Sequence, residues 1–143
     1  MDVPSHSTER ITRSRSSASP LRFALAVIAA AVADLAAFLA VPNWIGVAAI
    51  GAIGYLLFSA FGAGWFAGHW SALAGGLSVI VGAEAAAVFQ YFTATPAELS
   101  GASALDLVGW AVRLLISVLP FAVGGAFAGA AGGWLRRRAT ARR

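Results

Sequence analysis

The sequence predicts an all-α, polytopic membrane protein with a bundle of four transmembrane helices. Of its 143 residues, 59% are hydrophobic and only 11% are charged, whereas a soluble domain is roughly half apolar and a quarter charged. Two long apolar runs, 23–41 and 44–92, hold one full charge each, Asp34 and Glu84. The surface of a soluble protein cannot be built from so little charge, so the natural solvent of most of this chain is a lipid bilayer.

The lengths of the apolar runs set the number of crossings. A bilayer core of roughly 30 Å needs about 20 helical residues per crossing. The run 44–92 would be roughly 74 Å long as a single helix at about 1.5 Å per residue. It must therefore fold back once, which gives two helices, and the glycines and tryptophans of 62–70 suit a hairpin at the level of the lipid headgroups.

The remaining boundaries follow from proline, polar residues and charge. Pro42 and Asn43 end the first helix, because proline disfavours helical geometry at the residue before it. The Ser- and Arg-rich segment 1–20 lacks hydrophobic periodicity and is expected to be a disordered tail. The segment 93–105 is expected to be a loop, and 135–143 a basic tail. The predicted helices are 21–41, 44–66, 71–92 and 106–134.

Arginine placement predicts the orientation. Nine of the ten arginines lie on the N-terminal side of the first helix or after the last helix, and the long loop carries Glu98 but no base. The positive-inside rule places both tails in the cytoplasm. Two tails on one side require an even number of crossings, in agreement with four. We expect a multi-pass protein of the cell membrane, specifically of a bacterial inner membrane.

The first helix also has an alternative interpretation as a cleaved signal peptide. The tripeptide AVA before Asp34 is an acceptable cleavage site after Ala33. Two features favour a retained helix: the polar segment before it is long for a signal peptide, and the apolar run continues to Val41.

Small residues recur at helical spacing and predict close helix packing. Lipid offers no hydrophobic drive for helix association, so close backbone approach must supply van der Waals contact instead. Such a glycine-zipper stripe can pack helices within one chain or face another copy of the protein. The predicted packing positions are Gly64, Gly68, Ala72 and Gly76 in one stripe, and Gly125, Gly129 and Gly133 in another.

Three ionisable residues fall within the predicted helices at similar depth: Asp34, Glu84 and Arg113. Charged groups in a membrane are expensive and usually pair with one another. The sequence therefore predicts an intramembrane charge cluster in which Arg113 either bridges both carboxylates or pairs with one of them, with Asp34 as the favoured partner. Since there are two acids and one base, one carboxyl is left over. It is either an idle structural group or a working carboxylate for proton or cation translocation.

Enzymatic chemistry finds no support in the sequence. The chain has no cysteine, and it lacks the metal-binding, serine-nucleophile and phosphate-loop motifs. We therefore expect no enzyme activity, no cofactor and no metal. The arginines stand where membrane topology requires them, so nucleic acid is not an expected partner.

Two functions remain open. The first is a non-catalytic subunit whose partners are the lipid bilayer and either a second copy of the chain or another membrane protein. The second is a small proton- or cation-coupled transporter that uses Asp34 and Glu84. In its four predicted helices and its acid in the first one, the chain resembles the small multidrug-resistance transporters. That resemblance implies a dimer with Asp34 at the working position. The sequence departs from the family pattern by having Asp in place of Glu and by its long loop.

Overall fold

A computed structural model describes residues 20–40, 46–93 and 104–142, with side chains from 108 onward in the last range. This part of the chain is helical, which confirms the predicted all-α class. The predicted N-terminal tail (1–20) and the predicted loop (93–105) lie almost wholly outside the described residues. The elements are α1 (Pro20–Ala40), α2 (Val47–Ala67), the short 3-10 helix η1 (Gly68–Trp70), α3 (Ser71–Thr93) and α5 (Ala104–Ala141).

Among the described residues, three helical segments are long and apolar enough to cross a membrane: Pro20–Ala40, Val47–Thr93 and Val108–Ala141. The first three helices begin and end within three residues of the predicted bounds. The last helix continues to Ala141, past the predicted end at Trp134. The residues after Trp134 are Leu, Arg, Ala and Thr with no Gly or Pro, and Leu, Arg and Ala favour a helix, so nothing there stops it.

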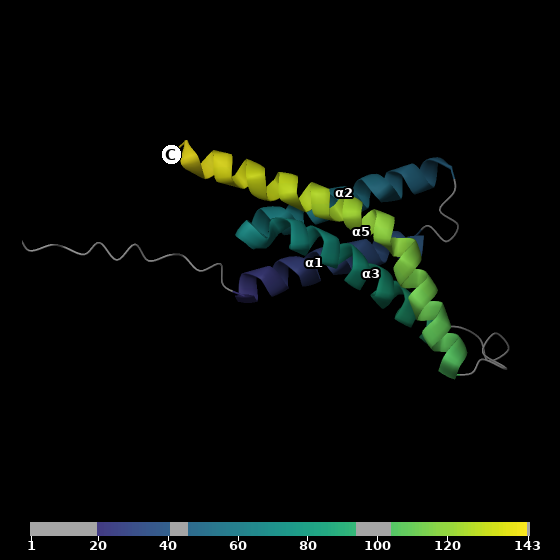
Figure 1. Ribbon diagram of the computed structural model, residues 1–143. Helices are drawn as coiled ribbons and strands as arrows, with labels where there is room; N and C mark the ends of the chain where they lie inside the picture. Colours follow the sequence, from purple (N-terminus) through teal and green to yellow (C-terminus); the bar gives the residue numbers. More distant parts are fainter. Residues whose placement is uncertain (1–19, 41–45, 94–103, 143) are drawn as a thin grey trace, which may run out of the picture.

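The chain reverses direction between α2 and α3 at Gly68, inside the predicted hairpin region. Gly68 has a φ of 78°, a left-handed conformation that glycine adopts without steric penalty. The single turn of η1 then leads into Ser71, and α3 runs back alongside α2 (Figure 1). The glycine thus makes two helices out of the long apolar run.

Helices α2 and α3 pack on each other, and each of them also contacts α1 and α5 (Figure 1). The buried positions are mostly small: Ala60 and Ala74 are fully buried, and Leu56 and Val79 are the only larger apolar side chains, among those described, that are nearly as well covered. Such a core brings backbones close together, as expected of helices that associate in lipid.

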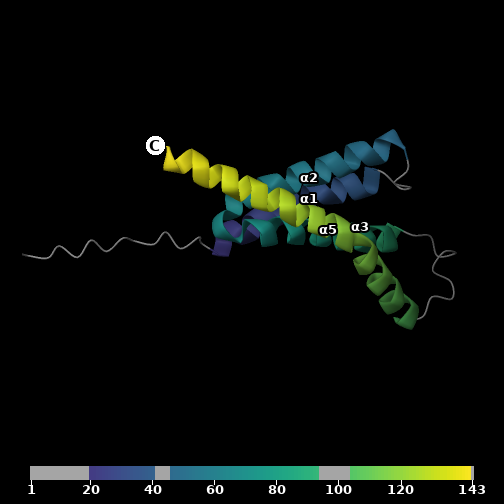
Figure 2. The same ribbon diagram turned by 45° about the horizontal axis from the view of Figure 1, so that its top comes forward.

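Helix α5 bends in its middle and contains Pro120 (Figure 2). Proline removes one backbone hydrogen bond and its ring displaces the preceding turn. Residues 108–119, which we name the α5 arm, precede the bend. None of the residues 108–117 is buried, whereas Val118 and Ala122 at the bend are. The arm therefore diverges from the bundle, which it still contacts through Leu114, while the rest of α5 packs on α2 and α3.

Candidate functional site: a buried carboxylate among three helices

Asp34 is the one fully buried charged side chain among the described residues, with an exposed fraction of 0%. Helical periodicity places Asp34 on the buried face of α1. Val27 lies seven residues before it, Ala30 four residues before it and Ala37 three residues after it, so all three share its face. All three of these positions are buried. The carboxyl therefore points into the bundle and not into lipid.

Gly82 of α3 makes room for this side chain. A methyl group on Gly82 would lie 2.6 Å from the Cβ atom of Asp34 and 3.0 Å from the carbonyl oxygen of Ala31. Only a residue without a side chain fits there. Gly82 was not among the packing residues predicted from the sequence.

Two hydroxyl groups neighbour the carboxyl, Ser59 of α2 and Ser78 of α3. Each hydroxyl donates its hydrogen bond to a backbone carbonyl, Ser59 to Ala30 and Ser78 to Gly75, both at 3.1 Å. A serine hydroxyl has a single proton to donate. Accordingly, neither carboxyl oxygen of Asp34 has a hydrogen-bond partner in the described part of the chain.

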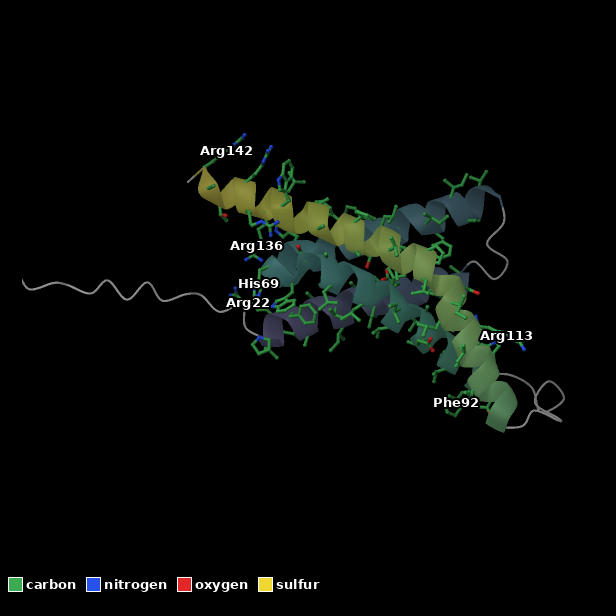
Figure 3. All side chains as sticks on the ribbon, in the orientation of Figure 1. Arg22, His69, Phe92, Arg113, Arg136 and Arg142 are labelled. Atoms are coloured by element: carbon green, nitrogen blue, oxygen red, sulfur yellow. The ribbon has the colours of Figure 1, made fainter. Side chains whose placement is uncertain are left out.

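The predicted ion pair between Asp34 and Arg113 does not form. Arg113 lies on the α5 arm, is exposed and points away from the bundle (Figure 3), and it has no ion pair with another described residue. Glu84 lies two residues after Gly82, so it is near the level of Asp34. It is half-buried and likewise has no described ion-pair partner.

Helix register explains why Arg113 misses the two acids. Gly75 of α3 contacts Gly125 and Gly129 of α5, and the two helices run in opposite directions (Figure 1). Extended along a straight α5, this register would place Arg113 about three to seven residues beyond the level of Glu84, or roughly 5–10 Å. The bend at Pro120 then turns the arm aside. The expectation of a shared depth did not include either effect.

Only some of the predicted packing residues make close contacts between helices. Gly125 and Gly129 contact Gly75, Gly133 contacts Ser71, and Gly64 contacts the backbone of Gly129. Gly68 serves the turn between α2 and α3. Ala72 is exposed, and Gly76 fits more loosely, 3.3 Å from the carbonyl oxygen of Ala122. One stripe through 64, 68, 72 and 76 is not possible, because the chain reverses within it.

The tight residues of α3 follow another pattern that the sequence does contain. Ser71, Gly75, Ser78 and Gly82 are spaced by four, three and four residues, and all four are buried. Alanines of α1 have the same alternating spacing, at 26, 30, 33, 37 and 40. Applied to α3, this spacing identifies Gly75 and Gly82 directly. Gly132, which contacts the backbone of Phe61 in α2, has no such signal.

In the described part of the chain, no group of three or more His, Cys, Asp or Glu side chains comes together as a metal site would require. No family model matches the chain, and neither the curated proteins nor the solved structures give a match. The features of the structure that bear on function are the buried Asp34, the α5 arm and the arginines at the opposite end of the bundle.

Proposed function

We propose that the chain is a non-catalytic subunit in the cell membrane, which binds another membrane-embedded segment through the α5 arm. In this proposal α1, α2, α3 and α5 each cross the bilayer once, with both termini in the cytoplasm. Arg22, Arg136 and Arg142 lie at one end of the bundle and Phe92 at the other (Figure 3). That distribution supports the positive-inside orientation.

The α5 arm is the observation that carries the proposal. A helix that belongs only to its own bundle buries one face over most of its length, as α1 does from Ala26 to Ala37 and α3 from Ser71 to Ala87. In the arm, Leu114 packs against the buried cluster that includes Val79 and Val118, but no residue from 108 to 117 is fully buried. Val108, Val112 and Ile116 are exposed by 62%, 51% and 61%. Four-residue spacing places these three on one side of the arm, where a neighbouring helix can pack.

Arg113 supplies the chemical requirement on the partner. It lies 23 residues before Arg136, roughly 34 Å along a straight helix, and the bend shortens this reach. The arginine therefore lies near the far boundary of a hydrocarbon core of roughly 30 Å. A guanidinium group at that depth favours a carboxylate partner.

Cross-linking through single cysteines tests this proposal, since the chain has no native cysteine. Ile116→Cys on the arm, labelled with a photoactivated cross-linking reagent, should give a cross-linked product in native membranes. Ile28→Cys on α1 is the matched control, with an exposed fraction of 57% against 61% for Ile116. We expect no product from it. Equal products from both positions, or none from Ile116→Cys, would show that the arm has no partner.

A second function is favoured by a different observation, the buried and unpaired carboxyl of Asp34. An ionised carboxylate without a partner is costly in an apolar interior, and an ionisable residue within a membrane is a functional candidate by default. In this alternative Asp34 exchanges a proton or a cation, assisted by the hydroxyl groups of Ser59 and Ser78. Proton-dependent flux in vesicles distinguishes the two functions, as argued below.

A further inference from the structure

The arginine-rich end of the bundle contains a cavity of about 290 Å³. Its walls come from three parts of the chain that are distant in sequence. Arg22 enters from the first turns of α1, His69 from the turn between α2 and α3, and Arg136 and Arg137 from the last turns of α5. Figure 3 shows Arg22, His69 and Arg136 at the same end of the molecule.

The charge of this cavity is not balanced by the described residues that line it. Three guanidinium groups line it, and none of its described lining residues is acidic. The acidic residues within the described ranges are Asp34, Glu84 and Asp106, all distant in sequence from the residues that form the cavity. An anion is therefore the ligand that the cavity suits, and arginine forks match the oxygens of phosphate.

One of the three arginines is already fixed in place. Arg136 donates hydrogen bonds from Nη1 to the carbonyl oxygens of Trp65 and Phe66, at 2.8 and 3.0 Å. These carbonyls belong to the last turn of α2, where helical partners are lacking. The remaining donors of the guanidinium, at Nε and Nη2, make no described hydrogen bond. Within the described part of the chain, these donors are left for a ligand.

The surroundings of the cavity indicate the source of the phosphate. Phe66 is 67% exposed and lines the same cavity, so an apolar surface adjoins the cationic one. Trp70, in the same turn, is also exposed, and tryptophan is enriched at the level of the headgroups. A lipid phosphate with its acyl chains would contact both surfaces, whereas free phosphate would use only the arginines.

We propose that this cavity is a binding site for a phosphate group, carried by an anionic lipid of the leaflet that faces the arginine-rich end. Not every arginine there belongs to the site. Arg138 stacks on the Trp134 ring at 3.8 Å, and Arg142 does not line the cavity. These two provide the same charge at the same end of the bundle and so allow a matched control.

The test uses the full-length chain purified in mild detergent. Its melting temperature is followed while short-chain phosphatidylglycerol, phosphatidylcholine or inorganic phosphate is added. We expect a saturable rise with phosphatidylglycerol and little with phosphatidylcholine. The double variant Arg22→Gln/Arg137→Gln should bind phosphatidylglycerol about ten to thirty times more weakly. Arg138→Gln/Arg142→Gln should stay within about twofold of the wild type, since neither side chain lines the cavity.

The possible outcomes distinguish a lipid phosphate site from a free-anion site and from unspecific attraction by charge. Equal losses in the two double variants would overturn the site, because total charge would then be sufficient. The absence of saturation would do the same. A saturable response to inorganic phosphate that the first pair of changes abolishes would keep the phosphate site but assign it to a free anion. If the glutamine double variant does not fold, Arg22→Lys/Arg137→Lys keeps the charge without the fork, and we expect it still to bind more weakly than the wild type.

Discussion

Gly82 of α3 lies so close to Asp34 of α1 that a methyl group on the glycine would come within 2.6 Å of the Cβ atom of the aspartate. The packing of α1 on α3 and the burial of the carboxyl are therefore one feature of the structure. A larger residue at position 82 must push the helices apart or turn the aspartate aside. Either change would admit lipid or water to the polar group.

Replacing Gly82 with alanine should destabilise the protein. Overpacking a close helix contact typically costs about 1–3 kcal/mol, and the rigid backbone around Ala31 leaves little room to adjust. The free energy of unfolding in detergent would be compared with that of Gly54→Ala, a helical position with nothing within 4 Å. Gly54→Ala should be neutral or slightly stabilising. If the two variants unfold alike, the close contact between α1 and α3 is not present in the protein.

The contact between α3 and α5 offers a sharper comparison, because two adjacent glycines differ in their surroundings. A methyl group on Gly125 would lie 2.7 Å from the carbonyl oxygen of Gly75 and 2.8 Å from a methyl group of Val79, whereas one on Gly124 would meet only Leu57, at 3.4 Å. Gly125→Ala should lower the melting temperature by several degrees, as expected for a loss of about 1–3 kcal/mol. Gly124→Ala should have little effect, and the reverse order would contradict the register of α3 on α5.

The helices could be predicted from the sequence, because long apolar runs, Pro42 and the glycines of 62–70 mark them directly. The position of Asp34 on the buried face of α1 also follows from helical spacing. These features are determined by residues close together in the sequence. The same spacing rule would have identified Gly75 and Gly82 if it had been applied to α3.

The pairing of charges could not be predicted in the same way. Asp34 and Arg113 fall at similar depth only if α3 and α5 have a particular register and α5 is straight. The contacts of Gly75 with Gly125 and Gly129 set a different register, and Pro120 bends the helix. Register between two nonadjacent helices depends on which small residues meet, and a single sequence does not state this.

The bend itself can be measured within α5. Spin labels at cysteines replacing Val112 and Thr140 would be about 42 Å apart along a straight helix, at about 1.5 Å per residue. In the native chain the distance should be shorter. Pro120→Ala restores the missing backbone donor and should lengthen it towards the straight value, because the cause of the kink is removed. An unchanged distance in the variant would assign the bend to packing.

Arg113→Leu should leave the isolated protein nearly as stable as the native chain. Had Arg113 paired with a buried Asp34, its removal would cost about 3–5 kcal/mol. The arginine is instead exposed and without a described ion-pair partner. The change should be seen in association, as a loss of the cross-link formed through Ile116→Cys. Arg113→Lys keeps the charge and should retain part of it. A marked loss of stability in Arg113→Leu would restore the predicted charge cluster.

Asp34→Asn separates the two proposed functions. The amide has nearly the same shape as the carboxyl and fits beside Gly82, and it removes the possibility of a buried negative charge. If Asp34 is a structural group, the variant should fold and insert with a stability equal to or above that of the native chain, since an unpaired buried charge is costly, and cross-linking through Ile116→Cys should persist. If Asp34 works in proton or cation exchange, the variant should fold equally well but lose proton-dependent flux in reconstituted vesicles.

Glu84→Gln is the matched control, because Glu84 lies near the same level but is only half-buried. We expect the native chain to give no proton-dependent flux and both variants to cross-link. A flux in the native chain that Asp34→Asn abolishes and Glu84→Gln preserves would establish the transport function and assign it to the carboxyl beside Gly82.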